Sequence, residues 1–145
     1  MNGAVKAGIA YFAGMFAVGF LLGTGRVLLA IPVLGAWGAT LVELPIMLAI
    51  SWLYCAWLLR RFAVAETAGA RLTIGTVAFA LLMGAEILLG VGLFERTLPQ
   101  QVREMTGGPG LAGLIGQMAF AAFPLLQLRD GRADQRARFA AVDEP

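Results

Sequence analysis

Histidine is absent from this chain of 145 residues, and cysteine occurs only once, as Cys55. Zinc, haem and iron–sulfur sites usually need several His or Cys ligands, so the sequence predicts none of them. A single cysteine forms no internal disulfide, and without histidine it lacks a partner for nucleophilic catalysis. Cys55 lies in an apolar run, which favours a buried, unreactive thiol. We therefore predict no catalytic residue, no metal and no cofactor.

Charged residues are also scarce. They make up 14% of the chain, whereas about a quarter is usual in water-soluble proteins. Hydrophobic residues reach 59%, which is more apolar surface than so small a polar fraction can cover in water. The net charge of +2 comes from basic residues beside apolar stretches, a pattern that does not indicate nucleic-acid binding. The composition predicts an integral membrane protein whose main partner is the lipid bilayer.

Four long apolar stretches run along the chain. They cover residues 7–31, 36–59, 72–94 and 111–128. Each is close to the roughly 20 residues that a helix needs to cross about 30 Å of hydrocarbon. We therefore expect an all-α fold, with a transmembrane four-helix bundle over residues 1–128 and a polar cytoplasmic tail over residues 129–145.

Two connections carry local signals. Residues 32–35 are too few for anything but a tight turn between the first two helices. In the longest link, Thr97 and Gln100 have the spacing of a capping box. Gly107 and Gly108 come directly after a segment whose apolar residues recur at helical spacing. This pattern predicts a short helix on the membrane surface, and an irregular loop is the alternative.

Basic residues are distributed unevenly between the two sides that four crossings create. Eight fall on the side of the termini: Lys6, Arg60, Arg61, Arg71, Arg129, Arg132, Arg136 and Arg138. Three fall on or toward the other side: Arg26, Arg96 and Arg103. Cytoplasmic loops of membrane proteins are enriched in Lys and Arg. We therefore expect both termini to be cytoplasmic.

Four polar residues interrupt the apolar stretches: Arg26, Glu43, Glu86 and Gln117. A charged side chain inside a membrane costs about 2.5 to 3.5 kcal/mol on insertion scales and therefore needs a partner or a cavity. At about 1.5 Å per residue, all four lie roughly 8 to 12 Å below the outer boundary. Each shares a helix face with small or amphipathic residues, which indicates that it points inward. We expect one polar cluster, with Arg26 paired to Glu43.

The charges in this cluster allow two interpretations. Arg26 should hold one carboxylate ionised, while burial and that first carboxylate favour protonation of the second acid. This is the arrangement of a proton or cation site. It is equally the arrangement of a structural ion-paired core.

Helix packing also has sequence signals. Gly19 and Gly23 form a small-xxx-small motif that predicts close approach of another helix to the first one. Pro45 removes a backbone donor two residues after Glu43, so a kink is expected in the second helix.

Several segments together resemble a family of small four-helix inner-membrane proteins of proteobacteria. The likeness is carried by segments 19–28, 41–45, 51–52, 60–62, 85–86 and 116–117, together with Gly35. It covers most of the chain. The resemblance implies the bacterial inner membrane as the compartment, and it implies no activity, substrate or cofactor.

Three functional hypotheses follow. The first is a non-enzymatic membrane component or docking subunit, whose polar cluster sets bundle geometry or binds another membrane protein or a second copy of the chain. The alternative is a small proton- or cation-coupled carrier or channel. An intramembrane enzyme is third: Glu43 and Glu86 are an acid and base pair in type, but the sequence offers no nucleophile or metal site to accompany them.

Overall fold

The computed structural model describes the backbone of residues 3–142 and the side chains of residues 3–128. Over this range the chain is helical, which confirms the predicted all-α class. The elements are α1 (Gly3–Gly25), the π-helical segment η1 (Arg26–Ala30), α2 (Ile31–Arg61), α3 (Ala68–Gly92), α4 (Leu98–Thr106) and α5 (Gly108–Val142). The four predicted apolar stretches lie in α1 with η1, in α2, in α3 and in α5.

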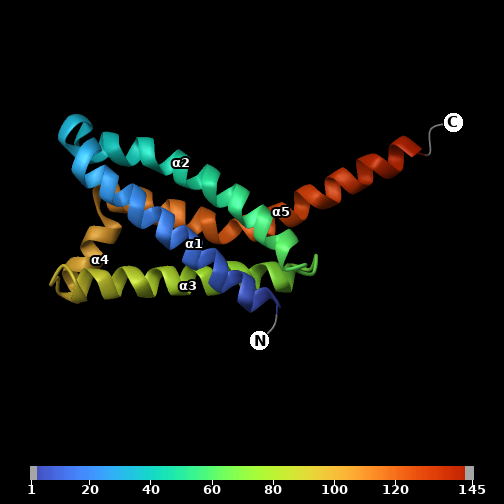
Figure 1. The fold of residues 1–145 in the computed structure, drawn as a ribbon, viewed down its shortest axis with the longest axis horizontal. Helices are drawn as coiled ribbons and strands as arrows, with labels where there is room; N and C mark the ends of the chain where they lie inside the picture. Colours follow the sequence, from blue (N-terminus) through green and yellow to red (C-terminus); the bar gives the residue numbers. More distant parts are fainter. Residues whose placement is uncertain (1–2, 143–145) are drawn as a thin grey trace.

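Three helical stretches are long and apolar enough to cross a membrane: Gly3–Arg61, Ala68–Gly92 and Gly108–Leu128. The first has 59 residues and folds back on itself, so that α1 and α2 run in opposite directions (Figure 1). The reversal follows η1 and contains Gly35, at φ 70° and ψ 172°. Only glycine adopts these angles without strain. The tight turn predicted at residues 32–35 is therefore present, and the four membrane crossings stay a prediction.

The long helices form a bundle with two distinct ends (Figure 1). The base is the end with Gly3 and the α2–α3 link, and the turn end carries η1 and α4. Around the bundle, α1 packs mainly on α3, α3 on α5 and α5 on α2, and the contact between α1 and α2 is smaller. Beyond the base, α5 continues past its predicted end at Leu128 to Val142. The side chains of the predicted tail lie outside the described residues.

The hydrophobic core occupies the base half of the bundle. Its buried members are Ala7, Tyr11, Met15, Cys55, Leu58, Leu59, Val64, Ile74, Ala78 and Phe120. Glycines bring the helices close together here. A Cβ at Gly8 would lie 3.0 Å from Val77 Cβ, and one at Gly75 would overlap the carbonyl oxygen of Ala121. Backbones therefore pack closely between α1 and α3 and between α3 and α5.

Within one chain, the packing predicted through Gly19 and Gly23 has no counterpart at Gly23, and packing of this face against a second copy stays a prediction. A Cβ at Gly23 would meet no atom within 4 Å, and one at Gly19 would only reach Met47 Cε at 3.4 Å. Both glycines line a cavity at the turn end. The small-xxx-small motif has no close backbone contact there because the close neighbour of α1 is α3, which it meets at Gly8 in the base half.

Two further local predictions have different outcomes. The short helix predicted after Thr97 is confirmed as α4, and the Thr97 N–H donates to Gln100 Oε1 at 2.8 Å in its capping box. Its place on a membrane surface stays a prediction. In α2, the residue with non-helical backbone angles is Gly35, whereas Pro45 lies inside the helix. A kink at Pro45 also stays a prediction.

Candidate functional site

A cavity of about 620 Å³ opens in the turn half of the bundle. Residues from α1, η1, α2, α3, α4 and α5 line it. Most of its lining is apolar, with Phe16, Phe20 and Phe120 as the aromatic members. Toward the base it ends at residues that border the packed core. All four predicted polar residues, Arg26, Glu43, Glu86 and Gln117, lie on its wall.

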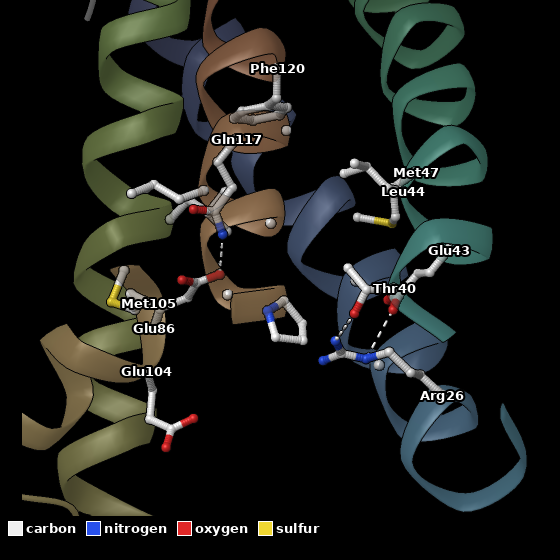
Figure 2. A pocket seen from close by; sticks show the side chains of 18 of the residues that line it. Arg26, Thr40, Glu43, Leu44, Met47, Glu86, Glu104, Met105, Gln117 and Phe120 are labelled. Atoms are coloured by element: carbon white, nitrogen blue, oxygen red, sulfur yellow. Dashed lines mark hydrogen bonds and ion pairs between the residues drawn. The ribbon is translucent and has the colours of Figure 1, made fainter. Parts of the chain in front are cut away.

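One wall of the cavity carries an ion pair. Arg26 Nε lies 2.9 Å from Glu43 Oε2, and Arg26 Nη1 donates to Thr40 Oγ1 at 3.3 Å (Figure 2). Thr40 and Glu43 are three residues apart and so share one face of α2. Arg26 is the first residue of η1, just before the chain turns back toward that face. The Arg26–Glu43 contact expected from the sequence is therefore present, at side-chain exposures of 36% and 18%.

The opposite wall carries the second acid. Gln117 Nε2 on α5 donates to Glu86 Oε1 on α3 (Figure 2). The other amide atom, Gln117 Oε1, is buried and has no hydrogen-bond partner among the described residues. Within the same range, Arg26–Glu43 is the one salt bridge found, so Glu86 has no basic partner. The expected cluster is thus present as two pairs on facing walls of one cavity.

Sequence reasoning missed Gln101, which is 5% exposed. Its Nε2 donates to the backbone oxygen of Glu86 at 3.3 Å, and its Oε1 accepts from Arg96 Nη1 at 3.2 Å. A Cβ at Gly90 would overlap the Gln101 amide, so this glycine makes room for it. Gly90 lies four residues after Glu86 on the same helix face, which is the signal that pointed to a polar contact there.

A second polar contact, also missed, lies below the cavity. The Tyr11 hydroxyl is 2.6 Å from Ser51 Oγ and donates to the Phe120 carbonyl oxygen at 3.3 Å. Its ring stacks on that of Phe120, with centroids 4.2 Å apart. A tyrosine in the middle of an apolar span needs a partner for its hydroxyl, and this was the available signal. The contact joins α1, α2 and α5 beneath the cavity.

Among residues 3–128, no three His, Cys, Asp or Glu side chains come together as metal ligands do. Cys55 is a free thiol, buried in the core beside Tyr11 as its apolar context predicted. In comparisons with protein-family models, with curated proteins and with solved structures, none matches this chain.

Proposed function

We propose that this chain is a non-enzymatic integral membrane protein that binds a small ligand inside its helical bundle, as a carrier does. The observation that supports this most is the cavity, which has polar pairs on facing walls of an otherwise apolar lining. Ligand sites in proteins are typically apolar clefts of about 300 to 1,000 Å³ with a few placed polar groups. At about 620 Å³, this cavity falls within that range.

The cavity favours ligand binding over the structural interpretation of the polar residues. A core whose ion pair served only to fix helix geometry would be closely packed, because interiors without a ligand leave few voids. Here the packed core lies in the base half, and the polar side chains lie around open space in the other half.

The proposal includes the bacterial inner membrane as compartment and four crossings with cytoplasmic termini. The folding of Gly3–Arg61 into two antiparallel helices supports an even number of crossings. A reporter fused after Pro145 should then be active only in the cytoplasm. Activity of the same fusion only in the periplasm would reverse the topology.

Ligand binding is tested with two variants of α1. Gly23 lines the cavity and Gly25 does not, and a Cβ at either position would meet no atom within 4 Å. Gly23→Leu should place its side chain in the cavity, and Gly25→Leu is its matched control. Both proteins and the wild type are purified in detergent and screened by thermal shift against small molecules of differing charge.

We expect at least one compound to stabilise the wild type and Gly25→Leu but not Gly23→Leu. A ligand at 100 times its Kd stabilises a protein by about 2.7 kcal/mol, which such a screen detects. A docking subunit predicts a different result. In that case no compound stabilises the protein, and another membrane protein co-purifies with the wild type after mild solubilisation. That outcome would overturn the proposal.

A further inference from the structure

We infer that the ligand of this cavity is an amphipathic organic cation with N–H donors, whose charged end binds Glu86. This inference rests on the proposed function and names the chemical class of the ligand. It follows from an imbalance between the two polar pairs on the cavity wall.

The charges of the Arg26–Glu43 pair balance each other, although Arg26 Nε lacks the alignment of a hydrogen bond. Arg26 has both a carboxylate at 2.9 Å and the Thr40 hydroxyl at 3.3 Å. Its charge is balanced, so it attracts a further anion only weakly. This wall of the cavity therefore does not favour an anionic ligand.

The Glu86–Gln117 pair is left with unused acceptors. The Glu86 carboxylate accepts one N–H from Gln117 and lies beyond salt-bridge distance from every described cation. Gln117 Oε1 also lacks a described partner, but it has almost no accessible surface, so a ligand in the cavity would reach the Glu86 carboxylate and not this oxygen. An ammonium group carries up to three donors and one positive charge, so it would pair with that carboxylate.

The charged residues that line the cavity include more acids than bases. They are two arginines and three glutamates. Arg96 is directed to Gln101 and to the face of Phe94, whose centroid is 5.4 Å from its Cζ. Glu104, which is exposed, lies on the same side of the cavity as Glu86 (Figure 2). A cation in the cavity would thus have two acids on one side.

The rest of the lining suits an apolar body rather than a bare metal ion. Met15, Met47 and Met105 place adaptable thioether side chains around the space, and Phe120 closes it toward the base. Hard metal cations take six or more oxygen ligands, whereas a metal-ligand cluster is missing from the described residues. An organic cation with an aromatic or alkyl body matches both parts of the lining.

The test is a series of four probes that share one body: 4-phenylbutylammonium, its trimethylammonium analogue, 4-phenylbutanol and 5-phenylpentanoate. Binding to the detergent-solubilised wild type is measured by isothermal titration calorimetry. The primary ammonium should bind most tightly, the trimethyl analogue more weakly because it has no N–H, and the alcohol and carboxylate at least about tenfold more weakly still.

Two variants locate the site. Glu86→Gln removes the charge with almost no change of shape and should weaken ammonium binding at least about tenfold. Glu66→Gln is the matched control, because Glu66 is exposed in the α2–α3 link and does not line the cavity. It should leave the affinity unchanged. If Glu86→Gln does not fold, the order of the four probes on the wild type still decides.

Equal or tighter binding of the alcohol or the carboxylate would overturn the cation inference. So would an unchanged affinity in Glu86→Gln, or the failure of the ammonium probe to bind at its solubility limit. Each of these results leaves the proposed function intact if other compounds still lose their effect in Gly23→Leu. If no compound in the screen stabilises the wild type, both the cation inference and the proposed function are wrong.

Discussion

The base half and the turn half of the bundle are built from the same helices and differ in how they use small and polar residues. In the base half, Gly8 and Gly75 allow neighbouring helices into close contact, and the hydroxyl of Tyr11 is satisfied by buried partners. In the turn half, Gly23 and Gly113 have no atom within 4 Å of a built Cβ and line open space. These glycines allow close helix packing in the base half and line open space in the turn half, where Gly90 is an exception because it makes room for the Gln101 amide. The difference teaches that a small-residue motif reports packing only where a neighbouring helix is present.

The largest effect is expected at Gly75, in the closely packed base half. A Cβ there would overlap the carbonyl oxygen of Ala121, and backbone atoms cannot move aside as a side chain end does. Gly75→Ala should lower the free energy of unfolding by about 3 kcal/mol, the upper end for overpacked sites. Gly84→Ala on the same helix is the control, because a Cβ there meets nothing within 4 Å. Equal stability of the two variants in a detergent unfolding titration would contradict the close α3–α5 contact.

A smaller effect is expected from Tyr11→Phe. The change keeps the ring that stacks on Phe120 but leaves Ser51 Oγ buried without its 2.6 Å partner. The loss should be about 1 to 2 kcal/mol, since hydrogen bonds inside membrane bundles contribute modestly. Tyr54→Phe loses a 3.1 Å bond to the Ala10 carbonyl at a more exposed position, and should cost less. A larger loss for Tyr54→Phe would show that the Tyr11 contact does not hold the base half together.

The ion pair of the turn half should matter less than these packed contacts. Glu43→Gln leaves Arg26 without its carboxylate, and because Arg26 is 36% exposed the cost should be only about 1 kcal/mol. Replacing both residues with Gln should cost less than Glu43→Gln alone, since no cation is then left unpaired. Thermal unfolding of the two single variants and the double variant measures this. If the double variant is the least stable, the pair contributes net stability and is part of the structural core.

The smallest effect on stability is expected at Gly23. A Cβ at Gly23 meets open space and Gly23 lines the cavity, so the unfolding free energy of Gly23→Leu should change by no more than about 0.5 kcal/mol, the range of substitutions that disturb no contact. If another helix approached closely at this motif, as the sequence predicts, the larger side chain would instead be clearly destabilising. Size-exclusion chromatography with light scattering, run beside the unfolding titration, separates the two. A large loss of stability or a change of oligomeric state would show that a second copy of the chain covers this face.

Part of the candidate site was predictable because it depends on local features. Arg26 and Glu43 are joined by a short turn, and antiparallel helices of known length place them at one depth. Glu86 and Gln117 follow from the same depth argument. Gln101 was not predictable in this way, because its burial depends on α4 folding back against α3 at Gly90. The Tyr11 contact was missed because its hydroxyl reaches α2 and also α5, which is not a direct packing neighbour of α1.

The sequence by itself determined the helical class, the apolar stretches, the turn before Gly35 and the capping box of α4, since each depends on neighbouring residues along the chain. Only the tertiary structure decided which helices are neighbours, which glycines are contact points, and that the polar residues divide into two pairs around a cavity. The physical reason is that helices apolar on all sides have no single hydrophobic face to mark their interior. Their packing is selected by shape and by a few polar contacts between segments far apart in the chain.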